Sequence, residues 1–321
     1  MMHAKHTLLA TAIATLVGLP QLACEVACIE DGSGTRCTAK SLKRYDGARP
    51  AAQAFNAAPG APITIDVLYG NVFVTRSASP QVVVEFAPFA YAAYDNQATA
   101  DQELAQNLRV AAAQQGGITV TVARQGGSNG LGSDVVVRVP DAFTGAINIV
   151  NRAGGPLNHF DVKTDFVGNA SAISVQNSAS MGSCYIQAAP SVKNTTVQCK
   201  NVISVFDVSD TVNITNDKRD HEGGTPAITL RMAGASAGGG KVYSASGSIA
   251  ATFPAAGGYT LAARASRGSV KEGTLPAACS KRERSAGDKD ILCGAGPNYD
   301  IQAGHAPTGP AREANVDLSF R

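Results

Sequence analysis

A six-residue phrase recurs four times in the middle of the chain and limits its fold more than any other feature. The copies are AINIVN, AISVQN, TVQCKN and TVNITN, at residues 146–151, 172–177, 196–201 and 211–216. Each begins with a small residue, alternates apolar and polar residues, and ends in asparagine. Because successive side chains of a β-strand point to opposite faces, each copy predicts a short strand with one buried face. A strand this short cannot bury that face alone, so the repeats predict stacked strands.

Two all-β architectures accommodate such repeats. In a β-solenoid the strands stack in parallel around a narrow core, whereas in a meander or sandwich they pair as antiparallel hairpins. No Asn-Gly or Asp-Gly turn separates the copies, which favours the solenoid. Asparagine tolerates left-handed backbone and bonds its own turn, so Asn151, Asn177, Asn201 and Asn216 are predicted at the corners of successive coils. The other interpretation of these four residues is sugar binding.

The N-terminal residues have the form of a secretory signal peptide, over residues 1–23. Lys5 precedes an apolar stretch that is too short to span a membrane, and a small residue, Ala23, closes it. Cys24 follows directly and resembles the lipidated cysteine of bacterial lipoproteins. We therefore expect export to the bacterial cell envelope, with Cys24 as the candidate lipid attachment site. The alternative is a periplasmic or secreted protein with a spare thiol.

The other six of the seven cysteines fall into three local pairs. The pairs are Cys28 with Cys37, Cys184 with Cys199, and Cys279 with Cys293. Each disulfide would close a loop of roughly 10–16 residues and contribute about 3 kcal/mol in the chain-entropy model. Spacing alone does not fix connectivity, because six cysteines allow fifteen pairings. No pair has metal-ligand spacing, and only His159, His221 and His305 follow the signal segment, so we expect no metal and no cofactor.

The domain organisation follows from where the alternating pattern begins. Residues 24–61 are predicted to form a disulfide knot and an Ala/Pro-rich tether, or else an irregular first turn of the domain. Residues 62–321 are predicted to form one continuous domain. A helical insertion is expected near 98–114, where Thr99 and Gln102 resemble a capping box. Residues 279–293 are expected to be an exposed, charged, disulfide-closed loop.

The segments ITIDVLYGNVFV (63–74) and VVVRVPDAFTGAINIVNRAGGPL (135–157), with the repeats, resemble a bacterial putative-adhesin family. Members of that family are exported β-solenoids of short stacked strands. The resemblance covers roughly residues 62–263. It implies surface display and adhesion, and it supplies no catalytic residues.

The expected function is that of a non-enzymatic envelope protein, a surface lipoprotein with an adhesive, structural or partner-binding role. The net charge of +2 gives no electrostatic reason to expect nucleic acid. The expected partner is an unidentified surface protein or glycan, and membrane contact is expected only through a lipid anchor. The alternative is a carbohydrate-active β-helix enzyme, a polysaccharide lyase or glycosidase, whose candidate residues are Asp161, Asp165, Lys163 and Arg152.

Overall fold

The computed structural model describes residues 23–31, 34–92, 94, 96–155, 157, 159–167, 169–218, 226–304 and 313–321, and for 23–41 it describes the backbone only. Within these ranges the chain forms 23 strands and one helix, so the prediction of an all-β chain with a single helix is confirmed. The predicted signal peptide lies outside the described residues except for Ala23. His221 and His305 lie outside them as well.

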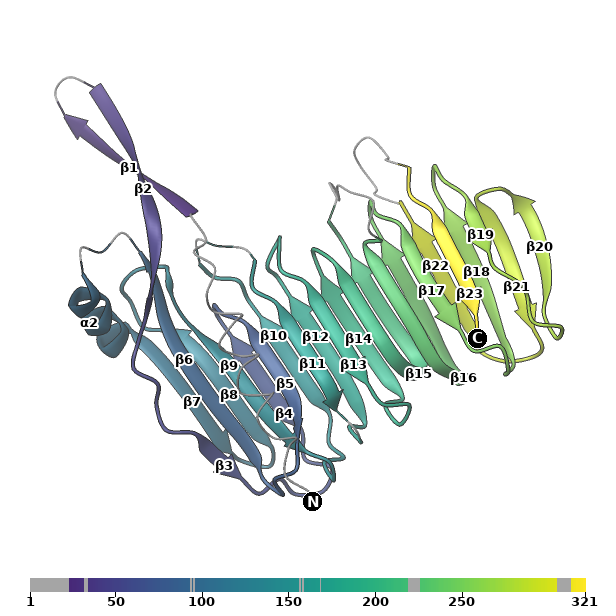
Figure 1. Ribbon diagram of the computed structural model, residues 1–321, viewed down its shortest axis with the longest axis horizontal. Coiled ribbons are helices and arrows are strands. Elements are labelled where there is room, and N and C mark those ends of the chain that lie inside the picture. The colour runs from purple at the N-terminus through teal and green to yellow at the C-terminus, as the bar shows by residue number, and fades with distance from the viewer. Residues whose placement is uncertain are drawn as a thin grey trace, which may run out of the picture.

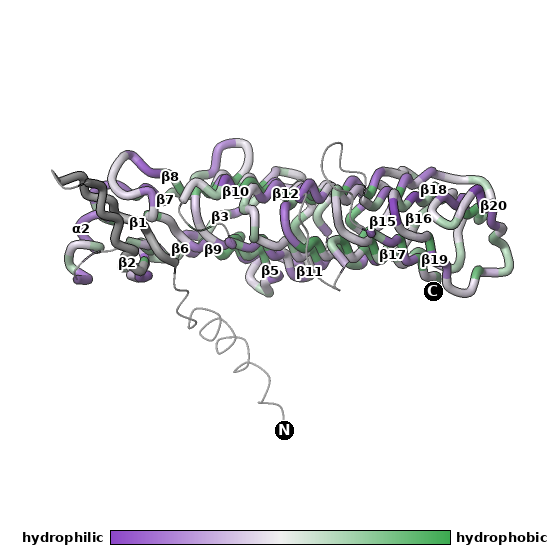
Figure 2. The backbone as a smooth tube through the Cα atoms, turned by 90° about the horizontal axis from the view of Figure 1, so that it is seen from above, coloured by the Kyte–Doolittle hydropathy of each residue, from purple (hydrophilic) through white to green (hydrophobic). Residues whose placement is uncertain are grey.

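The strands form two layers that face each other, which Figure 2 shows edge-on. The first layer contains, from neighbour to neighbour, β7 (Leu108–Gln114), β8 (Ile118–Arg124), β4 (Ile63–Val67), β10 (Ile147–Asn151), β12 (Ala172–Asn177), β14 (Asn194–Cys199), the second half of β15 (Ile203–Asn216), the second half of β16 (Ile228–Ser244), β22 (Asn298–Ala303), β18 (Tyr259–Ala265), β21 (Asp288–Cys293) and β20 (Ser280–Ser285). Figure 1 shows that the chain advances along the long axis, from α2 at one end to β20 at the other.

The second layer is built in the same way. It contains β6 (Val82–Ala92), β9 (Leu131–Pro140), β5 (Val72–Ser77), β11 (Val162–Val167), β13 (Cys184–Ala188), the first halves of β15 and β16, β17 (Ile249–Phe253), β23 (Val316–Phe320) and β19 (Val270–Glu272). Strands β15 and β16 run from the second layer into the first, so all the strands share one hydrogen-bonded network.

The repeated strands pair in parallel, and each pairs with the strand two places further along the chain. Strand β10 pairs with β12, and β12 with β14, while β11 pairs with β13 in the other layer. The chain therefore alternates between the layers. The antiparallel pairing of a meander or sandwich does not describe the repeats.

The core lies between the two layers. Inward-facing residues at the same register position are apolar in one neighbouring strand after another. In the first layer one such row contains Ile65, Ile149, Val175, Val197 and Ile214, each at most 1% exposed. Ile147 and Ile149, the two isoleucines of the first copy of the phrase, belong to this core, as the predicted buried face requires. Period-two alternation in short strands thus produces a continuous apolar interior.

The helix α2 (Gln97–Asn107) is shorter than predicted. Its N-cap is Asn96, whose side-chain oxygen accepts a hydrogen bond from the backbone N–H of Thr99 at 3.0 Å. Residues 108–114, expected to be helical, instead form β7, which pairs antiparallel with β8. Alternation of Leu108, Val110 and Ala112 fits a strand, and β-pairing prevails over the local helix propensity of alanine.

Both ends of the stack carry antiparallel strands that sequence reasoning did not predict. Part of the expected tether forms β2 (Gly34–Asp46) and β3 (Gln53–Phe55), both paired with β6, and β1 (Ala23–Asp31) forms a hairpin with β2. The expected 279–293 loop is the hairpin β20–β21, which adds to β18. All six residues of β20 are exposed and four are charged (SKRERS), a composition that discourages further pairing at a sheet edge.

Candidate binding surface

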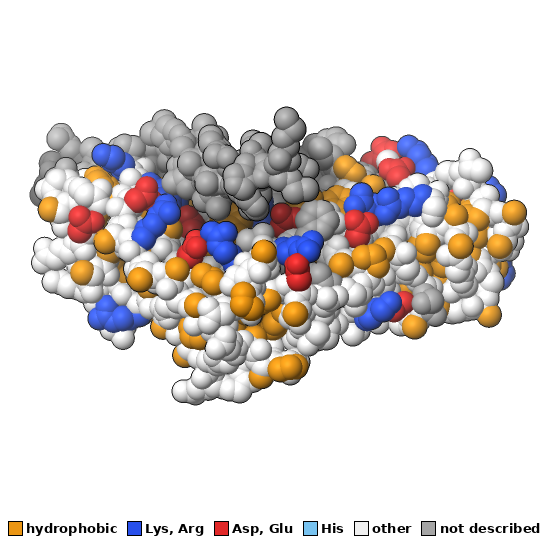
Figure 3. All heavy atoms as spheres, turned by 60° about the horizontal axis from the view of Figure 1, so that its bottom comes forward, with side chains coloured by type: hydrophobic (Ala, Val, Ile, Leu, Met, Phe, Trp, Pro, Cys, Tyr) orange, Lys and Arg blue, Asp and Glu red, His pale blue; other side chains and the backbone are white. Residues whose placement is uncertain are grey.

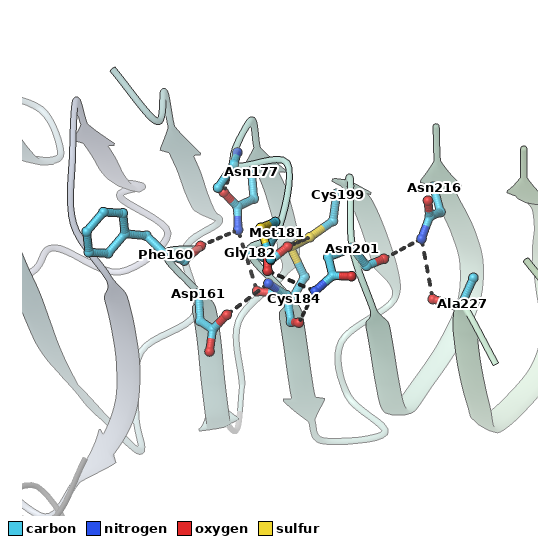
Figure 4. The surroundings of a disulfide bond; sticks show 12 residues. Phe160, Asp161, Asn177, Met181, Gly182, Cys184, Cys199, Asn201, Asn216 and Ala227 are labelled. Carbon is cyan, nitrogen blue, oxygen red and sulfur yellow. Dashed lines mark hydrogen bonds between the residues drawn. A yellow bond between two sulfur atoms is a disulfide. The ribbon is translucent and has the colours of Figure 1, made fainter. Parts of the chain in front are cut away.

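The corner asparagines form a ladder inside the stack, shown in part in Figure 4. Asn151, Asn177 and Asn216 occupy equivalent register positions in the first layer and are at most 1% exposed. The side-chain oxygen of each accepts the N–H of the residue two places further on, as Asn177 does from Ala179 at 3.2 Å. Each side-chain amide donates to a backbone carbonyl, as Asn177 does to Phe160 at 2.9 Å. Three of the four predicted corners are therefore buried structural residues, and their burial rules out sugar binding by them.

Asn201 does not belong to this ladder. The residue opposite Asn177 is Cys199, so the third copy of the phrase is NTTVQC (194–199) rather than TVQCKN. Asn201 lies two residues later and donates to the carbonyl of Met181 at 2.8 Å and to the hydroxyl of Ser183 at 3.3 Å. Side chains alternate between the two faces of a strand with a period of two. A register shift of two residues therefore leaves every side chain on its predicted face, so alternation alone does not reveal the shift.

Two of the three predicted disulfides are present. Cys184 of β13 is bonded to Cys199 of β14, joining the two layers at a corner with 6.3 Å between the α-carbons. The second bond joins Cys279 to Cys293 across the hairpin at the end of the stack. Cys28 and Cys37 are opposite each other in the β1–β2 register, but their side chains lie outside the described part, as does the side chain of Cys24.

The four candidate residues of the enzyme alternative are not brought to one place. Asp161 forms an ion pair with Lys163 at 3.8 Å and accepts the backbone N–H of Ser183 at 2.9 Å. Arg152 donates from Nε and one terminal nitrogen to the two carboxylate oxygens of Asp66, on the first layer. Asp165 is exposed four residues after Asp161, a separation of about 13 Å along a strand. That exceeds the roughly 5–9.5 Å between the carboxyl groups of glycosidases.

Two segments have the G-x-S-x-G spacing of a nucleophile elbow, which sequence reasoning overlooked. GGSNG (126–130) connects β8 to β9, and the Ser128 hydroxyl there accepts the N–H of Gly130 at 3.2 Å. GASAG (234–238) lies within β16. A nucleophile elbow joins a strand to a helix, and neither segment does so.

Among the described residues, no group of three or more His, Cys, Asp or Glu side chains is placed to hold a metal ion. In the same part of the chain, no helix combines the length and hydropathy of a membrane-spanning segment.

The outward side of the second layer carries five neighbouring side chains, which we call the aromatic strip: Phe73, Lys163, Tyr185, Phe206 and Arg231. Lys163 is opposite both Phe73 and Tyr185 in the strand register, and Phe206 is opposite Arg231. The Lys163 ammonium lies 5.9 Å from the Phe73 ring centre, the two rings of Tyr185 and Phe206 are 5.5 Å apart, and the Arg231 guanidinium lies 5.0 Å from the Phe206 ring. Tyr185 is 40% exposed, so the strip is accessible.

Asp207 holds one end of the aromatic strip in place. Its carboxylate accepts hydrogen bonds from Arg231 at 2.9 and 2.5 Å, from Gln187 at 2.8 Å and from Arg321 at 3.2 Å. The hydrogen bonds from Arg231, with a smaller contribution from Gln187, hold the pKa of Asp207 below its usual range. Asp207 thereby fixes the Arg231 guanidinium beside Phe206.

Sequence reasoning missed the aromatic strip because its members come from five strands that are dispersed along the chain. Only their register brings them together. Of the five, only Lys163 is also a candidate residue of the enzyme alternative. Figure 3 shows that basic and acidic side chains lie next to each other on the face it displays, with hydrophobic side chains among them. Among the described residues, ion pairs such as Arg138–Glu85 and Arg231–Asp207 likewise place opposite charges side by side.

No family model and no curated protein matches the chain. Two solved bacterial structures are similar to it at low identity. A putative cell adhesion protein from Clostridium sporogenes is 8% identical, with a TM-score of 0.32, over 87% of this chain and 100% of that one. A putative adhesin from Bacteroides fragilis is 10% identical, with a TM-score of 0.27, over 84% and 96%.

Proposed function

We propose that the chain is a non-enzymatic protein of the bacterial cell envelope that binds a surface protein through the aromatic strip. In this proposal residues 62–321 form one β-solenoid domain, and the stacked coils serve as a rigid support for the strip. The observation that carries the proposal is the clustering of three aromatic and two cationic side chains on the outer side of the second layer. Aromatic residues and arginine are enriched where proteins bind one another, and they contribute most of the binding energy there.

Export is supported by the two disulfides and by the form of the N-terminal segment. Disulfides persist in oxidising compartments and are rare in the cytosol. We further propose that Cys24 is lipidated after removal of residues 1–23. In strand β1, Cys24 is opposite Ser41 of β2, the residue that precedes Leu42. Because β2 continues from there into its pairing with β6, a lipid on Cys24 would hold this end of the stack close to the membrane.

The anchor can be tested by feeding cells a palmitate analogue and detecting it on the purified protein. Label is expected on the wild type and not on the Cys24→Ser variant. A wild-type protein without label, or with label that survives Cys24→Ser, would refute lipidation at Cys24.

The binding role can be tested with fluorescent mature protein and intact bacteria of the producing strain. Binding is expected to fall at least tenfold when the bacteria are first treated with protease, because the proposed partner is a protein. The double variant Tyr185→Ala/Phe206→Ala should show the same loss. The matched control is Tyr243→Ala, which truncates a partly exposed aromatic side chain on the outer side of the first layer, away from the strip. Equal binding by the strip variant and the wild type would overturn the proposal.

A further inference from the structure

On the first layer, outward side chains of six neighbouring strands form two straight rows. The strands are β8, β4, β10, β12, β14 and the second half of β15. One row contains Thr119, Thr64, Asn148, Ser174, Thr196 and Asn213. The other contains Thr121, Asp66, Val150, Gln176, Gln198 and Thr215. We call these residues the polar array, and all of them are partly or fully exposed.

The polar array is nearly free of charge. Charged residues make up about 25% of an ordinary soluble domain. Of the residues in the two rows only Asp66 is charged, and the bidentate contact from Arg152 at 2.7 Å neutralises it. The second layer differs, since its outer surface contains Lys163, Asp165 and Arg231. Because charges attract ions and charged polymers, a surface without them is suited to a neutral ligand.

The polar array also has unused hydrogen-bonding capacity. Its threonine, serine and glutamine side chains make no hydrogen bond to any other group in the described part of the chain. Among the uncharged members, only Asn213 has a side-chain hydrogen bond within the described residues, in which its oxygen accepts the backbone N–H of Lys241 at 3.3 Å. The corner asparagines contrast with this, because their amides are fully used inside the stack. The outward hydroxyls and amides are therefore available to a ligand.

The spacing of the polar array is set by the strands. Neighbouring strands lie about 4.7–4.9 Å apart, so six of them extend the rows over about 24 Å. Each row repeats a short polar side chain at that interval. A ligand with the same kind of short repeat can make one contact per strand, and contacts joined in one polymer reinforce each other by raising the effective concentration.

We propose that the polar array binds a linear, uncharged polysaccharide lying across the strands of the first layer. Hydroxyl and amide side chains both donate and accept, as the hydroxyl groups of sugars require. This inference goes beyond the proposed function, because it concerns the opposite layer from the aromatic strip and a different class of partner. Together the two surfaces would let one molecule hold a glycan on one side and a protein on the other.

The test uses the mature protein and three soluble neutral polysaccharides: mixed-linkage β-glucan, galactomannan and dextran. Retardation in affinity gels and calorimetric titration should show binding to at least one, and long oligosaccharides of that polymer should bind more tightly than short ones. The variant Thr196→Ala/Gln198→Ala should weaken binding about tenfold, the effect of two lost neutral hydrogen bonds. The matched control, Ser204→Ala/Thr229→Ala, truncates outward hydroxyls of the second layer and should bind as the wild type does.

Two outcomes would overturn the inference: the absence of binding to all three polymers, and equal binding by the array variant and the wild type. Shortening of the bound polymer in size-exclusion chromatography would instead overturn the non-enzymatic role in the proposed function. Slowed ice growth without polysaccharide binding would assign the array to ice instead. Thermal unfolding of each variant shows whether it is folded. Because the strip variant Tyr185→Ala/Phe206→Ala leaves the array intact, the two proposals can fail separately.

Discussion

Cys199 occupies the register position on β14 that Asn177 occupies on β12. At this corner the ladder of buried asparagines is interrupted, and the disulfide to Cys184 makes the link between layers that an asparagine makes elsewhere. The disulfide and the asparagine thus serve the same purpose at equivalent places. Each fixes the chain where it passes from one layer to the other.

This equivalence predicts that asparagine can partly replace the disulfide. The variant Cys184→Ser/Cys199→Ser should lose about 3 kcal/mol of unfolding free energy, because a link closing a 15-residue separation is removed. Cys184→Ser/Cys199→Asn should recover about 1 kcal/mol of this through new hydrogen bonds at the corner. Urea denaturation measures both values.

The control for this recovery is the second disulfide, which lies outside the asparagine ladder. Cys279→Ser/Cys293→Asn should be no more stable than Cys279→Ser/Cys293→Ser. If asparagine at position 199 gives no gain over serine, or if position 293 gives an equal gain, the equivalence is wrong.

A second prediction concerns two adjacent residues of β12 that face opposite ways. Asn177→Ala should lower the unfolding free energy by about 1–3 kcal/mol, because it leaves the buried carbonyl of Phe160 and the N–H of Ala179 without partners. Gln176→Ala, on the exposed outer side, should change it by less than about 0.5 kcal/mol. Similar losses for both variants, measured by urea denaturation, would contradict the structural role of the ladder.

The repeats show how far the sequence predicts this fold. The alternation around Ile147 and Ile149 predicts the strands, their inward faces and the buried corner at Asn151, since each of these depends on local pattern alone. The same alternation has a period of two, so it cannot distinguish Cys199 from Asn201 as the corner residue. Only the hydrogen-bonded register, which connects distant segments, resolves that choice.

The ends of the stack were predicted less well, for a related physical reason. Strand β20 has no apolar face because it is an edge strand with every residue exposed, so hydrophobic alternation gives no sign of it. Sequence reasoning missed the aromatic strip because only the pairing of successive strands places Phe73 and Arg231 on the same surface. Local pattern predicts what each strand buries, whereas a surface that several strands share depends on their order and register.

A third prediction concerns Gly70, whose carbonyl accepts the side-chain amide of Asn151 at 2.8 Å. Gly70 has φ +145°, and a β-carbon there would lie 2.0 Å from the carbonyl oxygen of Ser133. Gly70→Ala therefore requires both a strained backbone and displacement of β9, and it should cost more than about 3 kcal/mol. Gly60→Ala is the control, because Gly60 has φ +76° but no atom within 4 Å of the added carbon. Equal thermal destabilisation by the two variants would show that the contact with Ser133 is unimportant.

A fourth prediction concerns the acid stability of the end of the stack. Glu272 of β19 binds Lys281 of β20 and, at 2.6 Å, Lys289 of β21, so it ties the edge of the second layer to the terminal hairpin of the first. These two hydrogen bonds lower the pKa of Glu272 from 4.5 to about 2. Because the folded pKa is lower than the unfolded one, the pairing stabilises the fold fully above pH 4.5, and this contribution is lost as the pH falls toward 2.

Glu272→Gln should therefore destabilise the protein at neutral pH by about 2 kcal/mol. The difference from the wild type should shrink steadily below pH 4.5, because the wild-type carboxylate then becomes protonated as well. Urea denaturation at a series of pH values between neutrality and pH 3 measures this difference. Glu313→Gln is the control, since Glu313 is exposed and outside every ion pair of the described residues, and it should have no effect at any pH. A Glu272→Gln deficit that does not change with pH would mean that packing, rather than the charge on Glu272, links the two layers at this end.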